Sequence, residues 1–230
     1  MKAASTIIVY FTGQLGDTLV TLPAMRALRA AFPESDFVLL TAQNSGKGVS
    51  PWDVLGPTSL FVDVLFYEPI NDKFQSLPKL LQLARRIRKV RPKAFFYLRD
   101  PHWESRDRDR FFFRRICGVS SCHGLEGHIR EEFGTRDSFG ALKRYPKETD
   151  YWLDLVRSWG IPVPAGSEAV FQLPISDNDR SRVQGYWTEA NIDPDAVPIA
   201  ICPGSNMPSK RWAYDNYKEE IGRASCRERV

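Results

Sequence analysis

The chain has 230 residues, of which 43% are hydrophobic and 26% charged, a composition typical of a soluble globular protein and not of a disordered or fibrous one. No uncharged apolar run reaches the roughly 18 residues of a membrane-spanning helix, and the apolar stretch near the N-terminus is too short for a signal peptide. We therefore expect a cytoplasmic protein with reduced cysteines. The net charge of +4 does not indicate nucleic acid, and no nucleic-acid partner is expected.

Short apolar runs alternate with amphipathic segments along the first 160 residues. Strands are expected at 7–11, 37–41, 61–66 and 94–98, and helices at 15–32, 77–91, 107–116 and 149–159. This alternation predicts an α/β protein whose parallel sheet has the doubly wound, Rossmann-like arrangement.

The clearest break in composition is the Gly- and Pro-rich stretch around residues 160–168. It predicts an N-terminal domain over 1–160, a linker over 161–168 and a second domain that starts at 169. That second domain is expected to contain a strand at 170–173, a helix at 177–190 and a strand at 199–202. The last ten residues, 221–230, resemble a translated sequencing adapter, so we expect a non-native tail and a second Rossmann-like domain, 169–220, that is truncated.

A glycine-containing motif follows the first predicted strand, with Gly13, Gln14, Gly16, Asp17 and Thr18 leading into the first helix. Ligands of open α/β sheets bind at such a position, because glycines let backbone approach a ligand and helix N-termini favour negative charge. From position alone, Asp17 is either a helix cap or a general base. The spacing is not G-x-G-x-x-G and so does not favour a dinucleotide oxidoreductase.

A second motif follows the strand expected at 199–202 and contains Gly204, Ser205 and Lys210. Small residues followed by a lysine suit recognition of a diphosphate, although Lys210 could equally be a solvated loop residue. The motif is not a P-loop.

Two segments, LGDTLVTLPAMRALRAAFP at 15–33 and IAICPGS-x4-KRW at 199–212, resemble glycosyltransferase family 9, the ADP-heptose:lipopolysaccharide heptosyltransferases. The resemblance implies a bacterial enzyme with a two-domain GT-B fold. It implies an acceptor-side cleft loop at Gly13, Gln14, Gly16 and Thr18, Asp17 as catalytic base, and donor-binding residues Gly204, Ser205 and Lys210.

The reaction so implied is inverting transfer of a sugar, a heptose, from a nucleotide diphosphate such as ADP-heptose to a lipopolysaccharide core or other envelope glycan. No cofactor or metal is expected. The family's later donor motif would lie beyond residue 220, so this chain is expected to be inactive.

A non-catalytic nucleotide- or glycan-binding module stays open as the alternative. In an enzyme Asp17 should face the cleft unpaired, whereas a module could bury it as a cap.

Arginines and lysines gather at 85–93 and at 106–115, around three phenylalanines. They could attract an acidic glycolipid at the cytoplasmic face of the inner membrane, or form solvated helix faces in which Asp107 and Asp109 pair with arginines. The nearby set Cys117, Cys122, His123 and His128 matches no common zinc spacing, which supports the expectation of no metal site.

Overall fold

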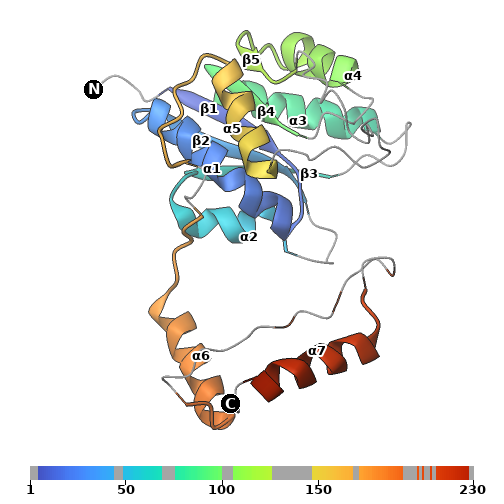
Figure 1. The fold of residues 1–230 in the computed structure, drawn as a ribbon. Coiled ribbons are helices and arrows are strands. Elements are labelled where there is room, and N and C mark those ends of the chain that lie inside the picture. The colour runs from blue at the N-terminus through green and yellow to red at the C-terminus, as the bar shows by residue number, and fades with distance from the viewer. Residues whose placement is uncertain are drawn as a thin grey trace, which may run out of the picture. The chain divides into compact units, whose positions relative to one another are not determined.

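The fold is that of a computed structural model, which describes residues 5–43, 49–68, 76–99, 106–125, 147–167, 171–193, 201, 204, 208 and 211–227. The chain divides into two compact units, Met1–Pro174 and Ile175–Val230 (Figure 1).

The first unit is built on a parallel sheet of five strands with the spatial order β3-β2-β1-β4-β5. The strands are β1 (Thr6–Phe11), β2 (Asp36–Ala42), β3 (Asp63–Tyr67), β4 (Ala94–Leu98) and β5 (Cys122–His123). From the central strand β1 the chain adds β2 and β3 on one side, and then returns to the other side of β1 to add β4 and β5. The direction in which strands are added therefore reverses between β1 and β4. This reversal is the topological switch point at which open α/β sheets bind ligands.

Helices cover both faces of the sheet (Figure 1). One face carries α1 (Leu15–Ala31), α2 (Pro51–Leu55) with the short 3-10 turn η1 (Gly56–Thr58), and α5 (Glu148–Ser158). The other carries α3 (Ser76–Val90) and α4 (Arg106–Phe111), which continues into the π-helical turn η2 (Phe112–Ile116). Successive side chains of β1 point to opposite faces of the sheet and so contribute to both core layers. Ile7, Val9 and Phe11 pack beneath α1, whereas Ile8 and Tyr10 pack beneath α3 and η2.

These elements confirm the predicted alternation of strands and helices in the first 160 residues. The predicted strand 61–66 begins later, at Asp63, because Phe61 packs into the core as part of the loop that follows η1. The predicted strand at 170–173 is wrong for the described residues 171–173, which are not in a strand. There the carbonyl of Gln172 accepts a hydrogen bond from Arg26 of α1, and Phe171 is exposed.

The predicted linker packs onto the first unit. Ile161 is buried, and Ser167 is buried with its hydroxyl donating to the carbonyl of Pro164 over 2.7 Å. Leu173 also contacts the core. The division between the units therefore falls between Pro174 and Ile175, later than the stretch that the composition indicated.

The second unit contains α6 (Asp177–Glu189) and α7 (Tyr214–Arg227). Ser176 caps α6, and its hydroxyl and backbone N–H both donate to Asp179, which lowers the pKa of that carboxyl. No described residue beyond Pro174 is buried. Ile201 is exposed and not in a strand, and the rest of the strand predicted at 199–202 lies outside the described residues. Residues 221–227 of the expected tail continue α7, and their origin stays a prediction.

Candidate functional site

The candidate site lies at the carboxyl ends of β1 and β4, on either side of the switch point. The chain leaves β1 through residues 12–14 and enters α1 directly, and it leaves β4 at Arg99. Two loops of different direction thus start side by side, an arrangement that exposes backbone groups and side chains to a ligand above the sheet edge.

Gly13 is required by close packing within the loop. A Cβ atom at this position would lie 2.7 Å from Cβ of Asp17 and 2.8 Å from Cζ of Phe11, a core residue. At Gly16, in contrast, a Cβ would meet nothing within 4 Å. Gly13 therefore lets the loop close onto α1, whereas Gly16 leaves the first turn of the helix open to solvent.

Asp17 lies in the first turn of α1, as predicted, and is exposed. Its Oδ2 accepts a hydrogen bond from the backbone N–H of Gln14 over 2.8 Å. Within the described part of the chain, Oδ1 accepts no hydrogen bond. Asp17 is thus a helix cap with one oxygen, and it presents the other at the sheet edge.

Thr18 has a different environment from its neighbours in the motif. It is fully buried, and its hydroxyl donates to the carbonyl of Gln14 over 2.8 Å. This bond fixes the start of α1, so Thr18 supports the loop and its hydroxyl does not reach solvent. Gln14 itself is exposed at the cap position.

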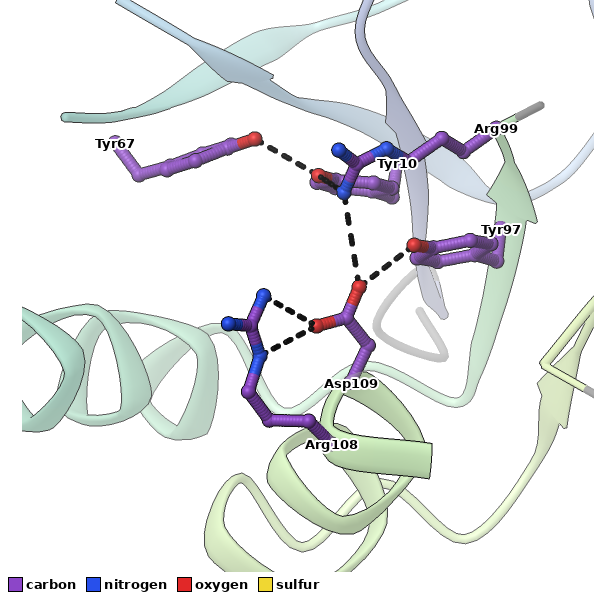
Figure 2. A network of polar contacts seen from close by, with 6 residues as sticks. All are labelled: Tyr10, Tyr67, Tyr97, Arg99, Arg108 and Asp109. Carbon is purple, nitrogen blue, oxygen red and sulfur yellow. Dashed lines mark hydrogen bonds and ion pairs between the residues drawn. The ribbon is translucent and has the colours of Figure 1, made fainter. Parts of the chain in front are cut away.

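A network of polar side chains lies at the carboxyl ends of β1, β3 and β4 (Figure 2). The Tyr10 and Tyr67 hydroxyls are 2.8 Å apart, and Arg99 Nη1 donates to the Tyr10 hydroxyl over 3.3 Å. Asp109 of α4 accepts from the Tyr97 hydroxyl at 2.7 Å and lies 3.7 Å from Arg99. The network therefore ties β1, β3 and β4 to α4 at the switch point.

Burial keeps the phenols of this network protonated. It raises the pKa of Tyr67 and of Tyr97, and the carboxylate of Asp109, hydrogen-bonded to Tyr97, raises the pKa of Tyr97 further. Burial also raises the pKa of Tyr10, against the opposing effect of Arg99. For Arg99, burial lowers the pKa, but the surrounding tyrosines outweigh it, and the net shift is upward. The network therefore joins neutral hydroxyls to the ion pair of Arg99 and Asp109, whose side chains are 16% and 13% exposed.

Of the members of this network, the sequence motifs indicated only Asp109, which was expected to pair with neighbouring arginines. That pairing is confirmed, because Arg108 lies 3.4 Å from Asp109 and Arg110 lies 3.2 Å from Asp107. A signal for the tyrosines was present, since Tyr10, Tyr67 and Tyr97 each stand at or next to the last residue of a strand. Their meeting depends on strand order, which the motifs do not encode.

The predicted donor-side residues belong to the second unit. Gly204 is exposed, and Ser205 and Lys210 lie outside the described residues. The structure thus brings Gly13, Gln14, Gly16, Asp17 and Thr18 together, and the roles of Gly204, Ser205 and Lys210 stay predictions.

Among the described residues, no group of three His, Cys, Asp or Glu side chains could hold a metal ion. Cys117 and Cys122 are buried, and the Cys122 thiol donates to the Val119 carbonyl over 3.5 Å. His123 stacks on Phe96 with ring centroids 4.9 Å apart. His128 lies outside the described residues. The helices that the structure describes include none of the length and apolarity needed to cross a bilayer.

The fold is similar to those of solved glycosyltransferases. A glycosyl transferase family 9 structure from Veillonella parvula superimposes with a TM-score of 0.64 at 17% identity, covering 97% of this chain and 61% of that one. Escherichia coli ADP-heptose lipopolysaccharide heptosyltransferase II superimposes with a TM-score of 0.58 at 15% identity, covering 97% and 62%. No protein-family model and no curated protein matches the sequence.

The predicted fold class, an α/β protein of the GT-B type with a Rossmann-like N-terminal domain, is confirmed by these superpositions. The chain spans about three fifths of the length of the two solved structures.

Proposed function

We propose that the protein is a glycosyltransferase that moves a sugar, a heptose, from a nucleotide diphosphate to a saccharide or lipid-linked acceptor of the bacterial cell envelope. The observation that carries the proposal is the placement of Asp17 at the carboxyl end of β1, with Oδ2 held by the Gln14 N–H at 2.8 Å and Oδ1 presented at the sheet edge. The fold shared with glycosyltransferases supports it.

Asp17 acts in this proposal as the general base. Its carboxylate takes the proton from the acceptor hydroxyl as that oxygen attacks the anomeric carbon and the diphosphate leaves, which inverts the centre. The hydrogen bond from Gln14 fixes the carboxylate, because a base held in one orientation needs no reorganisation when the acceptor arrives. Lys210 and loop amides meet the charge of the departing diphosphate, without a metal ion or cofactor.

The capping bond of Asp17 also favours a second candidate, a non-catalytic nucleotide- or glycan-binding module. In that case the carboxylate only stabilises the start of α1, an ordinary role for an acidic residue in a first helical turn. Such a module would bind a glycan or nucleotide at the sheet edge and transfer nothing.

A transfer assay separates the two. ADP-heptose and a lipopolysaccharide-core acceptor are incubated with the full-length gene product, since this chain spans about three fifths of its structural neighbours, and release of ADP is measured. The enzyme forms ADP only when both substrates are present. Binding of either substrate with no ADP release would support the module.

We further propose a cytoplasmic location in which the protein works at the inner face of the inner membrane.

A further inference from the structure

Positive charge is concentrated in two neighbouring helical segments of the first unit. Residues 76–93 contain seven lysines and arginines and no acidic residue, and residues 106–116 contain five arginines and two aspartates. The two segments together carry +10, whereas the whole chain carries +4, so the remainder is −6. Such segregation makes one surface strongly cationic.

The two segments lie on the same face of the sheet, which α3 and α4–η2 cover (Figure 1). Leu83, Ala84 and Ile87 turn inward from α3 to the core. Two of its cations turn toward β3, since Lys79 pairs with Glu68 and Arg86 donates to the Phe66 carbonyl over 2.6 Å. The other helical cations, Arg85, Arg88 and Lys89, are exposed.

Large apolar side chains are exposed among these cations. Leu77 and Leu81 of α3 are 62% and 44% exposed, and Phe111 of α4 is 60% exposed. At about 100° per residue, Leu77, Leu81 and Arg88 lie within roughly 40° of one another on the flank opposite Arg86. That flank faces η2, because Arg88 lines a cavity together with Cys117.

This cavity has a volume of about 380 Å³ and is lined by Arg88, Arg91, Pro92, Cys117 and Gly118. It lies at the amino-end edge of the sheet, opposite the candidate site, because helices in this fold run antiparallel to the strands. Burial raises the pKa of the Cys117 thiol to about 12, so the thiol adds no negative charge. The C-terminal ends of α3 and η2 each contribute roughly half a negative charge at the cavity. The guanidinium groups of Arg88 and Arg91 contribute two positive charges, so the net charge at the cavity is positive.

We propose that the surface formed by α3 and α4–η2 docks onto an anionic phospholipid bilayer, with a headgroup phosphate in the cavity between Arg88 and Arg91. Basic residues beside exposed leucine and phenylalanine are the combination that an interfacial helix uses, since the cations attract anionic headgroups and the apolar side chains enter the boundary with the acyl chains. A nucleic-acid partner would leave Leu77, Leu81 and Phe111 unpartnered. Glycosyl transfer is not needed for this docking.

The test is sedimentation of the full chain with vesicles of phosphatidylcholine alone and of phosphatidylcholine with about 30% phosphatidylglycerol at physiological salt. The wild-type chain binds the anionic vesicles and not the neutral ones. Arg85→Gln/Arg88→Gln/Lys89→Gln weakens binding about 100-fold, as expected for three cations near a charged surface. Arg180→Gln/Arg182→Gln/Lys218→Gln removes the same charge from exposed positions of α6 and α7 and weakens it less than about threefold.

Two further variants test insertion. Leu77→Ser/Phe111→Ser weakens binding to anionic vesicles at raised salt, where the Coulombic contribution is screened. Trp introduced by Leu81→Trp shows blue-shifted emission with anionic vesicles, whereas Val183→Trp on α6 does not.

Absence of wild-type binding, or equal loss in the two triple variants, overturns the proposal. Binding of duplex DNA that depends on Arg85, Arg88 and Lys89, without vesicle binding, assigns the surface to nucleic acid instead. Neither result bears on sugar transfer, which is measured with soluble substrates. Circular dichroism confirms that each variant is folded.

Discussion

The phenol of Tyr97 donates a hydrogen bond to Oδ2 of Asp109 over 2.7 Å, which links the end of β4 to the helix that follows it (Figure 2). Asp109 is 13% exposed, and its carboxylate is also held by Arg99 at 3.7 Å and by Arg108 at 3.4 Å. The network therefore holds the strand end beside the switch point in one position.

Tyr97→Phe should lower the free energy of unfolding by about 1–3 kcal/mol, because it leaves a mostly buried carboxylate short of a donor while it keeps the ring. Urea unfolding at pH 7 measures the change. Tyr186→Phe on exposed α6 is the matched control and should change stability by less than about 0.5 kcal/mol. Equal stabilities of the Tyr97 variant and the wild type would show that the network carries no net energy.

Stability should also fall in alkaline solution. Burial raises the folded-state pKa of Tyr67 and Tyr97 above the ordinary value of 10.0. Below pH 10 both phenols are protonated in the folded and unfolded chain; above it the unfolded chain loses protons that the folded chain keeps, so stability is lost as the pH rises toward the folded-state pKa. Each tyrosine contributes a slope of up to about 1.4 kcal/mol per pH unit.

Urea midpoints between pH 9 and 11 measure that slope. Tyr67→Phe/Tyr97→Phe should flatten it, whereas Tyr186→Phe should leave it unchanged. A slope that does not respond to the double variant would mean that other groups cause the alkaline loss.

The sequence predicted the scaffold of the site better than its contents. Apolar runs such as 7–11 and 94–98 located the strands, since continuous apolar sequence is what a sheet covered on both faces requires. The position of Asp17 followed from its place after β1. Arg99 and Tyr67 could not be assigned to the site in this way, because only the strand order β3-β2-β1-β4 brings both of them to Tyr10. The strand expected at 170–173, at the start of the predicted second domain, is wrong for the described residues 171–173, which pair with no strand and lie in the first unit.

The two loop glycines should respond differently to a methyl group. Gly13→Ala places Cβ 2.7 Å from Cβ of Asp17 and 2.8 Å from the Phe11 ring, and should destabilise the fold by about 1–3 kcal/mol. Gly16→Ala meets nothing within 4 Å and should leave stability unchanged or raise it by up to about 1 kcal/mol.

Thermal unfolding compares the two variants. In the proposed enzyme Gly16→Ala should also raise KM for the acceptor, because the methyl group is next to Asp17 at the sheet edge. A stable Gly13→Ala variant would contradict the packing argument.

Lys210 is expected to bind the donor diphosphate. In the full-length gene product, Lys210→Met should weaken nucleotide-sugar binding by about 10- to 150-fold, the effect of losing a charge-assisted contact of about 1.5–3 kcal/mol. Calorimetric titration with ADP-heptose measures it, and Lys218→Met, which removes an exposed cation of α7, is the control. A loss of kcat with unchanged donor affinity would assign Lys210 to the chemical step instead.

Asp17 offers the sharpest separation of the two candidate functions, because its capping and catalytic roles can be removed one at a time. Asp17→Asn retains an oxygen that can accept the Gln14 N–H bond but loses the basic carboxylate. In the full-length gene product it should keep the wild-type melting temperature and donor affinity while kcat falls about 10²- to 10⁴-fold, the usual contribution of a general base. Asp17→Ala should show the same loss of kcat and, in addition, a loss of about 0.5–2 kcal/mol in stability from the missing cap. Steady-state ADP release and thermal unfolding measure the two effects on the same samples. If Asp17→Asn turns over at the wild-type rate and only Asp17→Ala is impaired, through stability, the carboxylate is a cap and the assignment of the base is wrong.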